Sequence, residues 1–293
     1  MKQLLILSGK GGTGKTTVAA AFIRLSRARA YADCDVDAPN LHLIMKQAVE
    51  PKRTDYYGMP KARIDARACI ACGLCRDHCR FDAIKQADSY AVDPFACEGC
   101  GVCEFVCPAG AVSMVPAAAG EQLLYEDGHV VFSTAQLKTG GGTSGKLVTE
   151  VKRAMRDAAR SDTGVAVVDG SPGIGCPVIA SMSGATMALI VTEPSVSGLS
   201  DLKRIVRTAQ IFHTPPAVCV NKADVNAELS GQIERFCVDE GIPFVGRIPF
   251  DTQAIHAVNA GLTIADTECP SGKAVRAVYD RVVRLLEGMN END

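Results

Sequence analysis

SGKGGTGKTT, at residues 8–17, follows directly after the apolar run 4–7 and precedes a helix-forming run at 18–29. Its residues 9–16 match the pattern G-x-x-x-x-G-K-S/T, and a strand before it and a helix after it are the context that this pattern requires. Glycines let successive backbone N–H groups turn toward phosphate oxygens, and the start of a helix adds positive potential. We therefore expect a phosphate-binding loop, the alternative being a glycine-rich turn without a ligand.

Each residue type in this loop has a chemical use. Lys15 is expected to neutralise the β- and γ-phosphates of a nucleotide, while the Thr16 hydroxyl holds Mg²⁺. The residues expected to surround the phosphates are Gly9, Lys10, Gly11, Gly12, Thr13, Gly14, Lys15, Thr16 and Thr17.

Composition limits the possible partners. The net charge of the 293-residue chain is −2, with both signs spread along it, so there is no electrostatic case for nucleic acid. The apolar start, residues 1–7, is too short for a signal peptide. No stretch approaches the roughly 18 apolar residues of a membrane span. We predict a cytoplasmic protein with no nucleic-acid partner and no stable membrane insertion.

Cysteine is abundant, with 13 residues in the chain. A phosphate-loop protein without a signal peptide belongs in a reducing compartment, where clustered cysteines bind metal more often than they form disulfides. Eight of the cysteines fall between Cys69 and Cys107. The others are scattered and are expected to be small buried apolar residues: Cys34, Cys176, Cys219, Cys237 and Cys269.

The clustered cysteines form an internal repeat. ACIACGLCRDHCRFDAI, residues 68–84, aligns with ACEGCGVCEFVCPAGAV, residues 96–112, and each half reads C-x-x-C-x-x-C-x-x-x-C. This is the spacing of bacterial two-cluster ferredoxins, in which the fourth cysteine of each run binds the other cluster. Paired C-x-x-C elements can also hold zinc, but two four-cysteine runs favour iron–sulfur clusters.

The spacing predicts the ligands of two 4Fe–4S clusters. They are Cys69, Cys72, Cys75 and Cys107 for the first cluster, and Cys97, Cys100, Cys103 and Cys79 for the second. The ferredoxin ending C-P is kept at Cys107-Pro108, but Arg80 follows Cys79. A cation beside the sulfurs favours the reduced cluster, so Arg80 is expected to tune the potential rather than prevent assembly.

Lys10 adds a family resemblance. The run K-G-G-T-G-K-T-T resembles the deviant Walker A loop of the MinD/ParA/Mrp/nitrogenase-iron-protein family of ATPases. The resemblance implies that Lys10 crosses a subunit boundary to the nucleotide of the partner chain, and hence an ATP-dependent dimer. The alternative is that Lys10 is a solvated loop charge.

Three polar residues after the second apolar run match the same family. Asp33, Asp35 and Asn40 have the spacing of its D-x-D…N element. A carboxylate at the end of a strand beside a phosphate loop can orient the attacking water and bind waters of Mg²⁺, and we assign this role to Asp35. A simple turn before Ala38-Pro39 would explain the same residues.

A second switch is expected after the β-branched run 164–169, which is typical of a buried parallel strand. The sequence DGSPG, residues 169–173, resembles the family element D-x-x-P-G. The resemblance implies that Asp169 binds a water of Mg²⁺ and that the Gly173 amide senses the γ-phosphate. In the nitrogenase iron protein a nearby cysteine holds a cluster between subunits. Cys176 lacks an unclaimed partner cysteine here, so we expect it to serve packing or a turn.

The base is expected to contact two loops. Residues 221–224 read NKAD, and by resemblance an Asn here meets adenine, although N-K-x-D also reads guanine in GTPases. The lysine-containing phosphate loop favours ATP. Residues 249–251 resemble the family loop that packs over the base. The base-side residues are Asn221, Lys222, Asp224, Pro249 and Asp251.

A further glycine-rich run imitates a phosphate loop. Residues 140–146 fit G-x-x-x-x-G-K, but Leu147 stands where a Mg²⁺-binding hydroxyl is needed. We expect a flexible or anion-accepting turn before a helix at 146–160 rather than a second nucleotide site.

These patterns define the expected architecture. Alternating strands and helices predict an α/β protein with a doubly wound, mostly parallel sheet. The repeat predicts a small α+β ferredoxin-like domain at residues 61–116, inserted between the two parts of the ATPase domain, 1–60 and 117–293.

The leading functional hypothesis is a nucleotide-switched dimer, of identical or paralogous chains, that couples hydrolysis of Mg-ATP to electron transfer through two 4Fe–4S clusters. Lys15, Asp35 and Lys10 of the partner subunit would promote hydrolysis, and a redox protein would donate or accept electrons. The alternatives are an iron–sulfur cluster carrier of the Mrp type and a MinD/ParA-like positioning ATPase with redox-sensing clusters.

Overall fold

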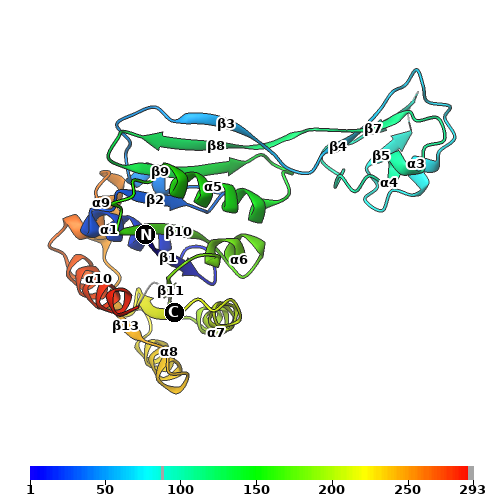
Figure 1. The fold of residues 1–293 in the computed structure, drawn as a ribbon. Coiled ribbons are helices and arrows are strands. Elements are labelled where there is room, and N and C mark those ends of the chain that lie inside the picture. Colours follow the sequence, from blue (N-terminus) through cyan, green and yellow to red (C-terminus); the bar gives the residue numbers. More distant parts are fainter. Residues whose placement is uncertain (87–88, 290–293) are drawn as a thin grey trace. The chain divides into compact units, whose positions relative to one another are not determined.

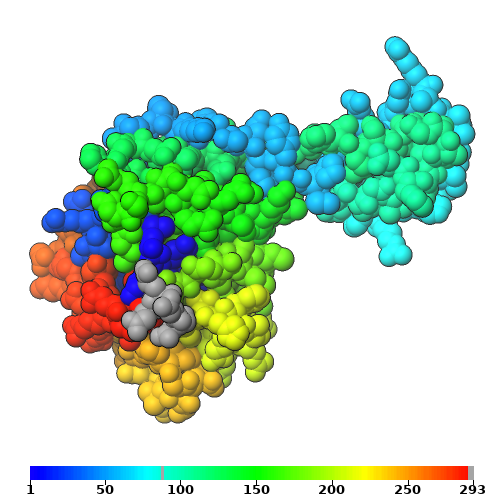
Figure 2. All heavy atoms as spheres, in the orientation of Figure 1, coloured from blue at the N-terminus to red at the C-terminus, as the bar shows by residue number. Residues whose placement is uncertain are grey.

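The computed structural model describes residues 1–86 and 89–289, and the chain forms two compact units. Unit 1 comprises Met1–Lys52, Leu123–Ala135 and Gly145–Asp293, and unit 2 comprises Arg53–Gln122 and Gln136–Ser144. Figure 1 traces the chain, and Figure 2 shows how side chains fill each unit, with most of unit 2 in cyan and blue-green.

A large sheet forms the centre of unit 1. Its strand order is β13-β12-β11-β1-β10-β2-β9-β8-β3, and all the ladders from β13 to β9 are parallel. The strands are β1 (Lys2–Ser8), β2 (Ala30–Asp33), β3 (Lys52–Tyr57), β8 (Ala118–Glu126), β9 (Val131–Leu137), β10 (Val165–Pro172), β11 (Met187–Thr192), β12 (Pro216–Asn221) and β13 (Phe244–Ile248). The expectation of a mostly parallel α/β sheet is confirmed.

Helices lie between the parallel strands along the chain, as such crossovers require, and further helices follow the last strand, β13. They are α1 (Lys15–Ser26), α2 (Leu41–Ile44), α5 (Ser144–Ala158), α6 (Cys176–Met182), α7 (Val196–Ile211), α8 (Ala227–Asp239), α9 (Thr252–Asn259) and α10 (Pro270–Gly288), with a 3₁₀ turn at Ile264–Asp266. Successive side chains of β1 point to opposite faces of the sheet. Leu4 and Ile6 share a buried cluster with residues of α1 and α10. The run 4–7 is buried throughout, as expected for a strand covered on both faces.

The parallel strands bring distant residues to one edge of the sheet. The phosphate loop follows β1, Asp33 ends β2, and Asn221 ends β12. Because the carboxyl ends of parallel strands lie at the same edge, the loops that follow them form one crevice.

Unit 2 contains two small antiparallel ladders and two short helices. β4 (Lys61–Ile64) pairs with β7 (Val112–Val115), and β5 (Ile84–Gln86) pairs with β6 (Tyr90–Val92). The repeat is visible in the helices α3 (Leu74–Asp77) and α4 (Val102–Phe105). Each begins after a glycine with positive φ, Gly73 at 83° and Gly101 at 77°, a conformation that other residues rarely adopt.

Unit 2 is larger than the repeat that the sequence delimits at 61–116. It begins at Arg53 and includes Gln136–Ser144, because these flanking segments bind each other. The Tyr56 hydroxyl lies 2.8 Å from Thr143 Oγ1 and 3.1 Å from the Thr143 carbonyl oxygen. In the described part of the chain, no helix has the length and apolar character needed to cross a membrane.

Candidate functional site

A cavity of about 590 Å³ lies at the carboxyl edge of the sheet in unit 1. Its walls come from the phosphate loop, from residues 35–40 after β2, and from the end of β10. Gly14 has φ of 89°, and a side chain there would also collide with the Asn221 amide. The fold therefore brings Thr16, Asp35 and the second switch to one cavity, as the sequence predicts for residues far apart in the chain.

Lys15 is buried at the bottom of this site and binds Asp169. Its Nζ lies 2.6 Å from Asp169 Oδ1, and the two side chains are almost fully buried. Burial alone would lower the pKa of Lys15, but the charge and hydrogen bond of Asp169 raise it above the ordinary value. The other carboxylate oxygen, Asp169 Oδ2, is buried without a protein partner among the described residues. A buried acceptor of this kind needs a donor, and a water of a Mg²⁺ ion would supply one.

Asp33 organises the loop after β2. One of its oxygens accepts a hydrogen bond from the Asp35 amide, and the other accepts bonds from the amides of Asn40 and Leu41, all at 3.0 Å. Burial, together with repulsion from Asp169, raises the pKa of Asp33 to about 7. The sequence placed Asp33 in a motif without giving it a role, which only the folded loop reveals.

Asp35 is half-buried and lines the cavity. Burial raises the pKa of its carboxyl group, and the positive charge of Lys15 opposes this rise. Asn40 lines the same wall, with its side-chain amide donating to the Ala38 carbonyl oxygen at 2.7 Å. Asp37, which the sequence did not single out, lies there too. A water molecule bound at this wall of the cavity would lie near the carboxylates of Asp35 and Asp37.

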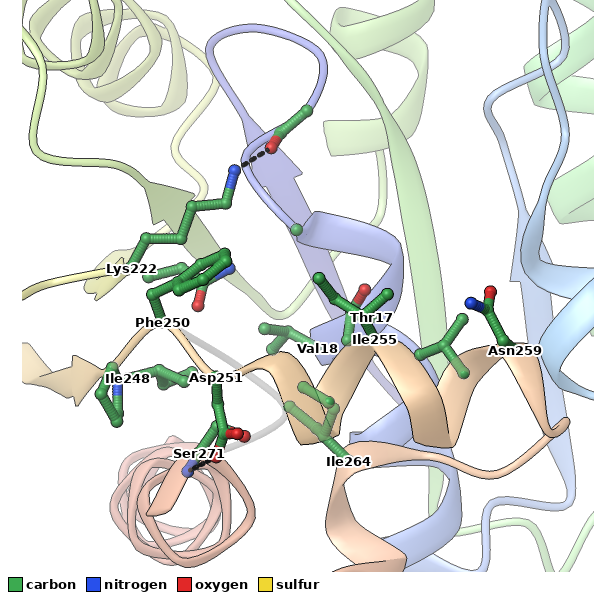
Figure 3. Close-up of a pocket in the computed structure, with 16 residues that line it drawn as sticks. Thr17, Val18, Lys222, Ile248, Phe250, Asp251, Ile255, Asn259, Ile264 and Ser271 are labelled. Carbon is green, nitrogen blue, oxygen red and sulfur yellow. Dashed lines mark hydrogen bonds between the residues drawn. The ribbon is translucent and has the colours of Figure 1, made fainter. Parts of the chain in front are cut away.

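A second cavity, of about 360 Å³, adjoins the phosphate loop on the side of β12 and β13 (Figure 3). Val18, Phe250 and Ile255 supply apolar walls that suit a flat aromatic ring. Asn221 donates to the Thr13 carbonyl oxygen at 2.7 Å, and Lys222 donates to that of Gly12 at 2.9 Å. These bonds fix the phosphate loop against the end of β12.

Two of the residues expected to contact the base, Asp224 and Asp251, bind backbone amides of neighbouring segments. Asp224 is exposed, and its Oδ1 accepts a hydrogen bond from the Phe250 amide at 2.6 Å. Asp251 lines the cavity wall and also accepts bonds from the amides of Ser271 and Gln253. The bond from Ser271 contributes most to lowering the pKa of Asp251.

Lys10 points away from both cavities. Its Nζ lies 2.7 Å from Glu193 Oε1 and 2.9 Å from Ser197 Oγ, beside the start of α7. Burial raises the pKa of Glu193, but Lys10 and Lys222 outweigh it and lower the pKa below the ordinary value. Sequence reasoning missed Glu193, because no motif links it to the phosphate loop.

Two small cavities in unit 2 collect the clustered cysteines. The first cysteine set, Cys69, Cys72, Cys75 and Cys107, lines one of them. The second cysteine set, Cys97, Cys100, Cys103 and Cys79, lines the other. Apolar residues complete both walls, among them Ile64 and Ile84. These are the two groups of four that the repeat spacing defines.

The cysteines surround these cavities without meeting at one point. Among the described residues, no three His, Cys, Asp or Glu side chains converge as ligands of a single metal ion. Burial raises the pKa of the Cys75 and Cys103 thiols. Burial also opposes ionisation of Cys107, but backbone N–H groups at residues 109–112 lower its pKa. Of the scattered cysteines, four are buried as expected: Cys34, Cys219, Cys237 and Cys269. The expectation of burial is wrong for Cys176, which is exposed at the first residue of α6.

Comparisons with known proteins agree with the fold. The chain is 28% identical over 293 residues to an uncharacterised protein of Methanocaldococcus jannaschii, covering 97% of each chain. It is 23% identical over 305 residues to an iron–sulfur cluster carrier protein of Pyrococcus horikoshii, covering 97% of this chain and 86% of the relative. The structure of the septum site-determining protein MinD complexed with Mg-ADP from Pyrococcus horikoshii matches with a TM-score of 0.59 and 17% identity over 99% of both chains, which is a likeness of fold.

The family model for the CobQ/CobB/MinD/ParA nucleotide binding domain matches residues 4–264, from β1 to the 3₁₀ turn. This range contains the glycine-rich loop at residues 8–17, Asp35, the DGSPG sequence at residues 169–173 and, apart from Ser271, the residues that line the two unit 1 cavities. The chain belongs to the CobQ/CobB/MinD/ParA family of nucleotide-binding domains.

Proposed function

We propose that this protein binds and hydrolyses Mg-ATP as a dimer and couples the nucleotide cycle to electron transfer through two 4Fe–4S clusters. The observation that carries the proposal is the presence, on one chain, of the family's nucleotide crevice and of two cavities that are each lined by four cysteines. The two parts of the ATPase domain, 1–60 and 117–293, would flank a ferredoxin-type insertion at 61–116.

The chemistry of hydrolysis would use side chains that line or adjoin the 590 Å³ cavity. Thr16, Asp35 and Asp169 would hold Mg²⁺ directly or through water, and the ion would neutralise charge on the phosphates. Asp35 would orient the attacking water. Lys15 would exchange its bond with Asp169 for the β- and γ-phosphates, because a buried ammonium needs a negative partner in both states.

The second switch would respond to the γ-phosphate. The Gly173 amide donates to the Ser8 carbonyl oxygen at 2.9 Å. Release of this bond would let the Gly173 amide turn to a phosphate oxygen. Lys15 would leave its ion pair with Asp169, the residue that begins the DGSPG sequence. The backbone conformation of the loop before α6 would then differ between the nucleotide states.

The base cavity favours ATP over GTP. A guanine reader needs a free carboxylate for the N1–H and the amino group of the base. Asp224 is turned to the Phe250 amide and is not among the residues that line the cavity. The remaining walls, with Asn221 and Phe250, are suited to adenine.

A dimer would give Lys10 its expected role. Lys10 has no contact with the phosphate cavity of its own chain and would reach the nucleotide of the partner subunit after leaving Glu193. Methanocaldococcus jannaschii has at least four relatives of this chain, two of which are 28% and 24% identical to it. One organism can therefore encode several different chains of this kind, so the proposed dimer can form from two paralogous chains or from two identical ones.

The cysteine cavities fit iron–sulfur clusters better than zinc. Zinc needs four sulfurs at about 2.3 Å from one centre. In a 4Fe–4S cluster each thiolate binds a different iron, so the sulfurs stand apart around a central volume. The lining of each cavity by four cysteines supports this second arrangement. When bound, each cluster would carry one electron, and the N–H groups around Cys107 would stabilise its thiolate.

A cluster carrier is the second candidate, because several relatives are named iron–sulfur cluster carrier proteins. Ligation by four cysteines per cluster argues for retention instead of release. Transfer of clusters to an apo-acceptor, without a change of potential on nucleotide binding, would favour the carrier.

The test is an anaerobic redox titration of the reconstituted protein, followed by electron paramagnetic resonance. We expect about eight iron atoms per chain and a cluster potential or spectrum that changes with Mg-ATP or a non-hydrolysable analogue. The Lys15→Ala variant should keep the iron and lose the nucleotide response. Stoichiometric zinc, or clusters that are indifferent to bound nucleotide, would contradict the proposal.

A further inference from the structure

The glycine-rich segment at residues 140–145 has no part in the proposed nucleotide or cluster chemistry. Although it imitates a phosphate loop, it lines neither nucleotide cavity. Its place in the chain is distinctive: Gln136–Ser144 belongs to unit 2, and Gly145 begins the last segment of unit 1. The segment is thus a covalent link between the two units, and each of its ends makes a close contact within its own unit.

The first end of the segment contacts the loop of the second cysteine set. Gly140 has φ of 74°, and a Cβ built on it would lie 3.2 Å from Phe95 Cδ1. Phe95 lies two residues before Cys97, in a turn where the Cys97 amide donates to the Asp93 carbonyl oxygen at 3.0 Å. The Gly140 backbone therefore packs against the ring that precedes this ligand loop.

The start of β4 and the residue before it also contact the loop of the second cysteine set. The Lys61 ammonium donates to the Cys97 carbonyl oxygen. Gly99 packs so closely on Pro60 that a Cβ would overlap the Pro60 carbonyl oxygen. Gly140 and the start of β4 are therefore both in contact with residues between 95 and 99.

The first cysteine set lies farther along the β4–β7 ladder. Ala62 and its partner Met114 line the cavity of the second set, whereas Ile64 and its partner Val112 line the cavity of the first. β4 begins at residue 61, so the second set is at the Lys61 end of this ladder and the first set is at the Ile64 end.

The other end of the segment contacts the helix that follows the second switch. A Cβ built on Gly145 would lie 3.1 Å from both the Cβ and the carbonyl oxygen of Cys176. Cys176 begins α6, three residues after Gly173. Lys152 of α5 then donates to the carbonyl oxygens of Ser181 and Ser183 at 2.5 and 2.6 Å. α5 thus contacts α6 at both ends of α6, through Gly145 at Cys176 and through Lys152 at Ser181 and Ser183.

We propose that the 140–145 segment transmits the nucleotide state of the second switch to the second cysteine set, so that the second cluster responds to nucleotide and the first does not. This inference rests on the proposed function. A shift of α6 at Cys176 would press on Gly145, and the short covalent segment would carry this displacement to Gly140 and to its contact with Phe95.

The experiment compares hydrogen–deuterium exchange of the cluster-loaded, full-length protein with and without Mg²⁺ and a non-hydrolysable ATP analogue. Mass spectrometry resolves residues 95–103, around the second set, from residues 69–75, around the first. We expect exchange at 95–103 to change by about fivefold or more, the lower end of typical coupling between sites, and exchange at 69–75 to stay constant.

Two pairs of variants isolate the two contacts. Phe95→Ala removes the ring, while Phe105→Ala removes a comparable exposed ring that also stands beside ligand cysteines; the two residues are 70% and 91% exposed. Gly145→Ala places a methyl group against Cys176, while Gly142→Ala adds one where nothing lies within 4 Å. Phe95→Ala and Gly145→Ala should abolish the nucleotide-dependent change, and both controls should keep it.

The outcomes separate this inference from the proposed function. If the wild-type protein binds nucleotide and carries its iron but shows no change at either set, by exchange or by potential, the proposed function itself fails. If the wild-type protein responds but Phe95→Ala and Gly145→Ala respond equally, the 140–145 segment is not the link. An equal response at residues 69–75 overturns the distinction between the two clusters.

Discussion

At the scale of single residues, Lys10 stands out because it lines neither nucleotide cavity of its own chain. Its ammonium is held by Glu193 and by two serine hydroxyls near α7. A lysine needed by the partner subunit's nucleotide must break these bonds first. If Lys10 acts across the subunit boundary as proposed, Glu193 competes with that contact.

Glu193→Gln should strengthen ATP-dependent dimerisation. The ion pair is partly exposed, and such pairs are worth about 0.2–1 kcal/mol, so its loss should tighten self-association by up to about fivefold. Analytical ultracentrifugation with Mg-ATP measures the change. Glu234→Gln, which removes a surface pair with Arg247, is the control and should have no effect. Weaker dimerisation of Glu193→Gln would show that Glu193 supports the dimer instead.

Asp33→Asn should change the pH dependence of stability. The Asp33 pKa is about 7 in the folded protein and about 3.9 when unfolded. Between these values the folded chain binds a proton that the unfolded chain has released, so this group makes the wild-type protein less stable as pH rises from about 5.5 to 7.

The measurement is the free energy of unfolding in urea across this pH range, without nucleotide. The curve of Asp33→Asn should lack this fall, whatever its absolute stability. Asp162 is exposed, and the hydrogen bond and charge of Arg29 lower its pKa, so Asp162→Asn should keep the wild-type slope. Parallel curves for wild type and Asp33→Asn would disprove the assignment.

At the scale of elements, α5 and α6 are joined by a buried lysine. Lys152 satisfies the carbonyl oxygens of Ser181 and Ser183 at the end of α6. Burial lowers the pKa of Lys152 to about 8, with a smaller contribution from Arg156, which shows that the ammonium is costly to bury. The hydrogen bonds of Lys152 therefore hold the end of α6 against α5.

Lys152→Met should destabilise unit 1 by about 1–3 kcal/mol, because buried acceptors lose their donor, although relief of the buried charge offsets part of the loss. Chemical denaturation followed by circular dichroism gives the value. Lys146→Met, at an exposed position of the same helix, should change stability by less than about 0.5 kcal/mol. A Lys152→Met protein as stable as the wild type would mean that these hydrogen bonds contribute nothing.

At the scale of the whole molecule, the two units have separate and unequal cores. Unit 1 has a large apolar cluster built from its sheet and helices. The buried cluster of unit 2 contains three cysteines and few other residues, which are Ala62, Ala83, Ile84, Tyr90 and Val112. So small a core rarely holds a fold without a metal or another cross-link.

Removal of iron should therefore unfold unit 2 and spare unit 1. After treatment with a chelator and a reductant, limited proteolysis should cut within residues 61–116, while affinity for a fluorescent ATP analogue persists, because metal binding and folding are coupled in small sites. The iron-loaded protein under the same protease should resist cleavage. Resistance of the iron-free protein would show that unit 2 folds without clusters.

The sequence by itself determined the features that depend on short spacing. The phosphate loop, the strands around it and the two groups of four cysteines could be predicted because a motif or repeat places chemically related residues at fixed local intervals. The mostly parallel sheet also followed from alternating strands and helices, and the family model agrees with it. The roles given to the individual loop and cysteine residues remain predictions.

Only the tertiary structure decided the contacts between residues that are distant in sequence. No local pattern pairs Lys10 with Glu193, turns Asp224 toward Phe250, or sets Gly145 against Cys176. These contacts exist because the parallel strands bring separate loops to one edge, and because α5 follows directly after the chain leaves unit 2. Spacing along the chain specifies which groups are available, and packing of the sheet and helices specifies which of them meet.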